Sequence, residues 1–150
     1  MKNSKPNLHL MNTEFLFEIN WLAVLAGAVA YFLLGALWYS KILFADKWIA
    51  YTKVDITDPN ATKGMAPIVL SSFAFLFLSC FALAVLRYRL DTEGWMGGLK
   101  TGLFTGLCFG AASISISYLY EKRPFGLHLI NNGYTILGNI IAAIIIFSWA

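Results

Sequence analysis

The sequence predicts an all-α fold: a polytopic integral membrane protein, built as a bundle of four transmembrane helices with a glycine-rich third helix suited to close packing. The first observation is composition, because 59% of the 150 residues are hydrophobic and 13% are charged, whereas a soluble domain has about a quarter charged residues. The second is the gathering of apolar residues into long blocks without Asp, Glu, Lys or Arg. The third is a glycine at every fourth position from 94 to 110.

The charge-free blocks set the number and the approximate limits of the spans. A helix of about 20 residues, at 1.5 Å per residue, crosses the ~30 Å hydrocarbon core of a bilayer. The blocks are residues 21–40, 66–86, 103–119 and 129–150. From them we expect spans at about 20–43, 66–88, 95–119 and 125–149, within one domain of residues 19–150. We expect residues 1–18 to form a flexible segment, in which Met11 is an alternative start to Met1.

Local signals mark how each span begins. Asn20 is suited to cap the first span, and Glu18 is favourably placed near the same helix end. The sizeable polar connection at 47–67 contains the turn sequence Asp58-Pro59-Asn60, and Pro67 suits the first turn of the second span. The later connections are short, so spans two to four should form hairpins, with Pro124 at the start of the fourth. Tryptophans at the span ends are typical of interfacial anchoring.

Four spans place both termini on one side of the membrane. The basic residues on that side are Lys2, Lys5, Arg87, Arg89 and Lys100, against Lys41, Lys47, Lys53, Lys63, Lys122 and Arg123 on the other. By the positive-inside rule this small excess favours connections inside and termini outside.

The glycine row predicts close helix packing. Glycine in a helix interior costs about 1 kcal/mol against alanine in water, whereas in lipid it allows two helix backbones to approach. The row comprises Gly94, Gly98, Gly102, Gly106 and Gly110. Two partners are compatible with it: another helix of the chain, for which Gly27 and Gly35 make the first span the candidate, or a second copy in a homo-oligomer.

The fourth span carries a polar face. His128, Asn132, Thr135 and Asn139 lie at i, i+4, i+7 and i+11, with Asn131 beside them. Polar side chains in a span are costly unless they face protein or water, so we expect this face to point inward. The aliphatic residues expected on the lipid side are Leu127, Ile130, Leu137, Ile141 and Ile144.

Polar residues from the other spans should lie at the same depth as this face. They are Trp38, Tyr39, Ser40, Lys41, Ser71, Ser72, Ser113, Ser115, Ser117, Glu121 and Arg123. One interpretation is that these groups hold helices together, at about 0.6 to 2 kcal/mol per contact. The other is a pocket for a lipid head group or small metabolite, with Glu121, Arg123 and His128 as its charges.

The sequence does not contain the residue patterns of common catalytic or cofactor sites. Cys80 and Cys108 fall within spans as packing residues, and His9 and His128 are too far apart to indicate a metal or haem site. We therefore expect no catalytic residue, metal, cofactor or nucleic-acid partner.

Three function classes remain. The first is a non-enzymatic protein that self-associates or joins a larger membrane complex, as the glycine row suggests. The second is a small-molecule transporter or channel, or a lipid- or small-ligand-binding protein, that uses the polar face. Span centres without charge argue against ion coupling in such a transporter. The third and least supported is a lipid-modifying enzyme using Glu121 and His128.

The sequence also resembles a known family. The stretch "INWLAVLAGAVAYFLLGALWYSKILFADKW" at 19–48 is similar to the N-terminal signature of a bacterial membrane-protein family catalogued as domain of unknown function 1761. The stretches "GWMGGLKTGLFTGLCFG" and "YEKRPFGLHLINNGYTILGNIIAAIIIFSW" resemble its second half.

The resemblance implies a small four-span protein of the bacterial inner membrane, without an assigned activity. The chain departs from the family pattern at Lys41, where proline is usual, and at Ala45, where glycine is usual. From these departures we expect the first helix to continue further than in the family.

Overall fold

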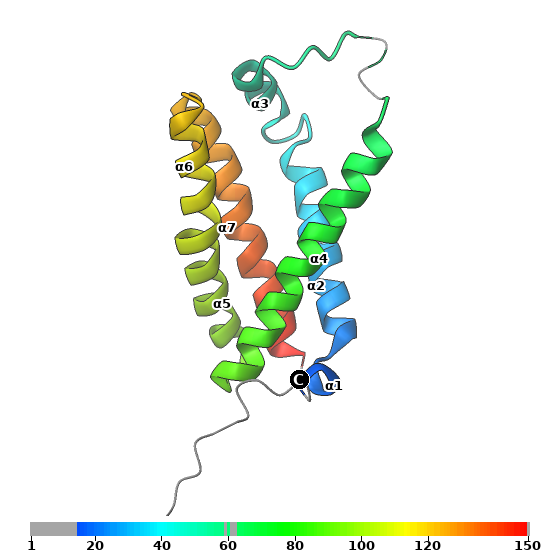
Figure 1. The fold of residues 1–150 in the computed structure, drawn as a ribbon, viewed down its shortest axis with the longest axis vertical. Coiled ribbons are helices and arrows are strands. Elements are labelled where there is room, and N and C mark those ends of the chain that lie inside the picture. The colour runs from blue at the N-terminus through cyan, green and yellow to red at the C-terminus, as the bar shows by residue number, and fades with distance from the viewer. Residues whose placement is uncertain (1–14, 59, 61–62, 150) are drawn as a thin grey trace, which may run out of the picture.

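The computed structural model describes residues 15–58, 60 and 63–149, which form helices and connecting turns (Figure 1). The helices are α1 (Phe15–Glu18), α2 (Trp21–Trp38), α3 (Ala45–Thr52), α4 (Met65–Leu90), α5 (Gly94–Thr105), η2 (Gly106–Ala111), α6 (Ala112–Tyr120) and α7 (Phe125–Ser148). Among the described residues, four helical segments are long and apolar enough to cross a membrane: α2, α4, α5–η2–α6 and α7. The predicted all-α, four-span fold is confirmed.

The N-terminal segment predicted at 1–18 is described only in part. Residues 1–14 lie outside the described residues, whereas Phe15–Glu18 form the short helix α1. Asn20 caps α2 as predicted, because its side-chain oxygen accepts a hydrogen bond from the Ala23 N–H at 3.0 Å.

The first span ends at Trp38, earlier than expected. The Ser40 hydroxyl donates to the Leu37 carbonyl at 2.7 Å and accepts from the Ile42 N–H at 3.3 Å. The Phe44 N–H donates to the Trp38 carbonyl at 3.1 Å. These bonds close a tight turn without proline, so the expectation that the helix continues through Lys41 is wrong.

The remaining span boundaries lie close to the predicted ones. Pro67 falls in the first turn of α4, and Pro124 is the N-cap residue of α7. The α4–α5 hairpin turns through Asp91 and Gly94, both with positive φ. The third span contains the π-helix η2, which the sequence did not predict. A π-turn has one residue more than an α-turn and is often found near functional sites.

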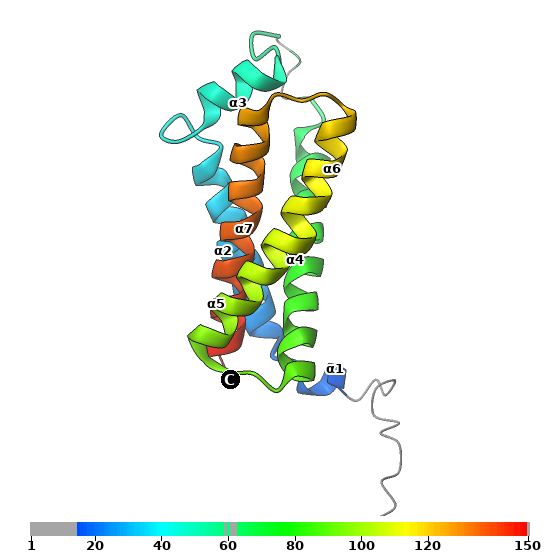
Figure 2. The ribbon, with the colours of Figure 1, turned by 90° about the vertical axis from the view of Figure 1, so that its left-hand side faces the viewer.

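Helix α7 lies at the centre of the bundle, in contact with α2, α4, and α5–η2–α6 (Figure 2). The buried core is at the end of the bundle where α7 finishes, and its residues are Ile19, Val24, Ala28, Tyr31, Cys80, Leu83, Ala84, Ala142, Ala143, Ile146 and Phe147. Leu127 and Ile130, expected to face lipid, are only 2% and 6% exposed. That expectation is wrong for these two residues because α7 has neighbours on more than one side.

Helix α4 packs on the bundle from Phe73 onward. Its buried residues are Cys80, Leu83 and Ala84, whereas every residue from 65 to 72 is exposed. In Figure 1 the N-terminal half of α4 leans away from α6 and from α2 toward the end of the bundle that carries α3. Ser71 and Ser72 are therefore not part of an inward polar cluster, contrary to expectation.

Candidate functional site

The glycine row of the third span faces α7. Gly98, Gly102 and Gly106 are buried. A Cβ added at Gly98 would lie 2.6 Å from the Ala143 carbonyl oxygen, and one added at Gly102 would lie 2.6 Å from the Asn139 carbonyl oxygen. Backbone meets backbone along this contact, as small residues allow in membranes.

The two ends of the row differ from its centre. Gly110 faces the methyl group of Thr135, whereas Gly94 has open space around it and φ of +78°. An L side chain rarely adopts such a φ, so glycine at position 94 serves the turn that begins α5 rather than helix packing.

The first span does not meet the row. An added Cβ at Gly27 would meet Ile146, and one at Gly35 would meet Tyr134, both on α7. The expectation that these two glycines pack against the row is therefore wrong. Glycines of α2 and of the third span instead contact α7 from different sides.

Near the α3 end of the bundle, Asn131 joins three helical segments. Its Oδ1 accepts from the Tyr39 hydroxyl at 2.8 Å, and its Nδ2 donates to the Tyr118 hydroxyl at 2.5 Å. Trp38, which closes α2, donates from its indole N–H to the Ile130 carbonyl at 3.0 Å. These bonds connect α7 to the C-terminal end of α2 and to α6. We call Trp38, Tyr39, Tyr118 and Asn131 the interfacial polar group.

The three charges predicted for a pocket do not come together. Glu121 and Arg123 form an exposed ion pair at 2.9 Å, and Ser117 donates to Glu121 at 3.2 Å. The hydrogen bond from Arg123, followed by the one from Ser117, lowers the pKa of the Glu121 carboxyl. His128 is 7% exposed and packs against the rings of Tyr118 and Phe125.

A second polar group lies halfway along the spans. The Tyr31 hydroxyl donates to the Thr135 carbonyl at 3.1 Å and accepts from Asn139 Nδ2 at 3.2 Å. Asn139 Nδ2 also donates to the Thr135 carbonyl at 2.8 Å, and Thr105 approaches Asn139 Oδ1 at 3.5 Å.

This group lines a crevice of about 450 Å³ between the packed half of α4 and η2. Its lining residues are Tyr31, Ser79, Ala82, Leu83, Leu86, Thr105, Phe109, Gly110, Ser113, Thr135 and Asn139. Because they come from the middle of α2, of the third span and of α7, together with the second half of α4, we call it the mid-membrane crevice.

A family comparison covers this whole region. The model of a family described as "Protein of unknown function (DUF1761)" matches residues 22–147. The chain belongs to this family. No match was found among curated proteins or among solved structures.

In this DUF1761 chain, the crevice, the interfacial polar group and the glycine contacts all fall within the matched residues. The predicted polar face is divided between them. Thr135 and Asn139 line the crevice and Asn131 belongs to the interfacial group, while Asn132 donates to Ser115 at 2.7 Å. Across residues 15–58, 60 and 63–149, no three His, Cys, Asp or Glu residues are grouped to hold a metal ion.

The sequence did not single out Tyr31 as a site residue, although it joins α2 to α7 at the crevice. Its only signal was a hydroxyl within an otherwise apolar block. Thr105 and Ser79, which also line the crevice, carried no signal beyond a hydroxyl in a span.

Proposed function

We propose that this protein is a non-enzymatic, ligand-binding membrane protein that holds a neutral, lipid-soluble molecule in the mid-membrane crevice. The observation that carries the proposal is a crevice at half the depth of the spans, whose lining combines hydroxyl and amide groups with apolar side chains and contains no charged side chain. Polar groups at such a depth are expensive and are associated with function.

The hydrogen bonds within the crevice favour a ligand that donates. Thr105, Ser79 and Thr135 donate their hydroxyl hydrogens to carbonyls of their own helices, at 2.9, 3.0 and 3.0 Å. Asn139 donates to Thr135 and Tyr31, and Tyr31 donates to Thr135. The donors of these five residues are thus used, while their hydroxyl oxygens and Asn139 Oδ1 retain accepting capacity, and Ser113 is the one lining hydroxyl outside this set. A hydroxyl or amide N–H on the ligand matches this arrangement.

The surroundings of the crevice favour entry from the lipid. The crevice lies between the packed half of α4 and the π-helix η2. Ser79 on α4 and Phe109 on η2, which line it from these two segments, are both exposed on the outer surface of the bundle. A molecule moving sideways between these two segments reaches the acceptors without crossing the membrane surface. The absence of charge among the lining residues supports a neutral ligand over an ion.

Self-association, the hypothesis that the glycine row favours, now has weaker support. The central glycines of the row contact the α7 backbone, so they are not available to a second copy. Ligand binding in the crevice needs no such partner, and for this reason we place it first.

The experiment uses a diazirine-bearing long-chain alcohol and its methyl ether, photo-crosslinked to the protein in nanodiscs and mapped by mass spectrometry. We expect the alcohol to label crevice residues such as Leu86 and Phe109, and the ether, which lacks the donor, to label them about tenfold less. Asn139→Leu should reduce alcohol labelling to the level of the ether.

The matched control is Asn132→Leu, because this second α7 amide bonds Ser115 and does not line the crevice. It should leave labelling unchanged. Circular dichroism and melting of each variant separate loss of binding from loss of fold, and Thr105→Val is a second crevice variant. Equal labelling by alcohol and ether, or equal labelling of the two asparagine variants, would overturn the proposal.

A further inference from the structure

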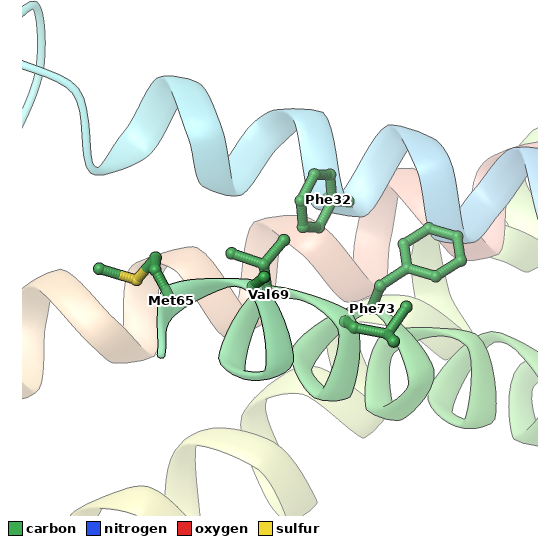
Figure 3. A pocket seen from close by; sticks show the side chains of 6 residues that line it. Phe32, Met65, Val69 and Phe73 are labelled. Carbon is green, nitrogen blue, oxygen red and sulfur yellow. The ribbon is translucent and has the colours of Figure 1, made fainter. Parts of the chain in front are cut away.

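A separate apolar groove runs between α2 and the exposed half of α4. It has a volume of about 650 Å³ and is lined by Phe32, Met65, Ala66, Val69, Leu70 and Phe73. Figure 3 shows Phe32 on α2 across from Val69 and Phe73 on α4, with Met65 at the start of α4. None of these side chains carries a nitrogen or oxygen atom, so the groove offers only dispersion contacts to an occupant.

The groove exists because α4 leans outward. Met65, Val69 and Phe73 are spaced by four residues and form one face of α4, which lines the groove with Phe32 of α2. Toward the middle of the bundle the groove is closed by the Phe32 and Phe73 rings, whose centroids lie 5.7 Å apart. Toward the α3 end, Met65 and Val69 remain 45% and 42% exposed.

At that open end the groove meets a second pocket, of about 570 Å³, beside α3. Its lining residues are Tyr39, Ala45, Trp48, Ile49, Val54, Ile56, Met65 and Asn131. Met65 lines both cavities, so they adjoin at this side chain. The lining residues of the second pocket whose side chains carry nitrogen or oxygen are Tyr39, Trp48 and Asn131. At this level α2 has already ended, at Trp38.

The two cavities together match an amphiphilic molecule, because the groove is apolar and the adjoining pocket contains polar side chains. The groove from Met65 to Phe73 covers about 12 Å of helix at 1.5 Å per residue. It lies between two of the four helices that are long and apolar enough to cross a membrane. Tyrosine and tryptophan side chains are enriched at the level of lipid head groups. Bilayer lipid is therefore the molecule that reaches both cavities at once.

We propose that one membrane phospholipid binds here, with an acyl chain in the α2–α4 groove and its glycerol ester region beside Tyr39, Trp48 and Asn131 under α3. The lipid supplies the apolar contacts that the exposed half of α4 does not make with the bundle. This site is distinct from the mid-membrane crevice, shares none of its lining residues, and does not depend on the function proposed above.

The experiment uses a phosphatidylcholine with a diazirine in one acyl chain, present as a small fraction of nanodisc lipid, with crosslinks mapped by mass spectrometry. We expect labelling at 65–73 to exceed labelling at Leu103, Phe104 and Leu107, three exposed residues of the third span, by about fivefold. Val69→Trp fills the groove and should remove this excess. Leu103→Trp, the matched control on an exposed face, should leave it unchanged.

Val69 is partly exposed, so tryptophan there should be tolerated, and a melting curve checks this. Ala66→Phe is a second variant that blocks the groove near Met65. Equal labelling of the two sets of residues, or an excess that survives both variants, would mean ordinary annular lipid and overturn the proposal. Absence of lipid labelling at 65–73, together with a mass of two or more chains in native mass spectrometry, would also overturn it, in favour of a second copy.

Discussion

At the scale of single residues, glycine in this protein allows close helix contacts because it has no side chain. Gly102 is the clearest case, since a Cβ there would lie 2.6 Å both from the Asn139 carbonyl oxygen and from the Ile140 Cα. Both are backbone atoms, which move only if the whole helix moves. Gly35 is different, because its added Cβ would first meet the Tyr134 hydroxyl at 2.9 Å, and a side chain has room to shift.

Gly102→Leu should therefore destabilise the bundle by about 1–3 kcal/mol, the usual cost of forcing extra methylenes into a packed contact. The measurement is thermal unfolding in detergent, followed by circular dichroism. Ala112→Leu adds a comparable side chain at an exposed position of the same span and should melt like the parent. If the two variants melt together, the row is not a packing contact.

Single residues also show what the sequence alone predicts about the site. The amides of Asn131 and Asn139 stand out in an apolar span, and both take part in polar groups between helices. Tyr31 was missed because its role depends on the rotation of α2 relative to α7, which no local pattern encodes. Leu127 and Ile130 were misassigned for a related reason, since an aliphatic face looks the same whether it meets lipid or protein.

At the scale of elements, the third span is the one that departs from regular helix. The π-helix η2 lies beside the crevice, and Phe109 and Gly110 within it contribute to the lining. A π-turn contains one residue more than an α-turn, and the extra residue is accommodated within that turn. The helices α5 and α6, on either side of η2, therefore both keep one face toward α7. The sequence carries no pattern for this, because glycine and small residues suit either helix type.

Deleting Cys108, an exposed residue of η2, should restore a regular α-helix while α6 still faces α7. We expect the variant to melt within about 2–4 °C of the parent, a loss of roughly 1 kcal/mol, and to bind the photoreactive alcohol poorly because Phe109 and Gly110 are displaced. Unfolding scans and crosslink yields measure the two effects.

The control deletion is Leu137, an exposed residue of α7. No π-turn is present in that helix to absorb the change, so the residues that follow rotate by about 100°. Asn139 and the core residues near Ile146 then face the wrong neighbours, and the variant should unfold far below the parent. Equal melting of the two deletion variants would contradict the role given to η2.

At the scale of the whole molecule, the number of spans and their short hairpins follow from hydropathy and turn residues. The arrangement of the helices does not. The sequence is compatible with two partners for the glycine row of the third span, the first span or a second copy. In the structure α7 contacts both the first and the third span through glycine-lined faces. The outward tilt of α4 could not be predicted from the sequence either. Residues 65–72 contain no charged side chain, as is also true of helix segments that pack inside the bundle.

The central place of α7 bears on assembly. A homo-oligomer formed through the glycine row would need Gly98, Gly102 and Gly106 at the surface, and these three residues are buried against α7. We therefore predict that Gly102→Leu lowers the melting temperature without changing the number of subunits, which native mass spectrometry from nanodiscs reports in multiples of 16.7 kDa. A variant that melts like the parent but loses subunits would place the row at an interface between copies. Any oligomer that persists in Gly102→Leu must instead use an outer surface, such as the exposed apolar face of α5 and η2 at Leu103 and Leu107.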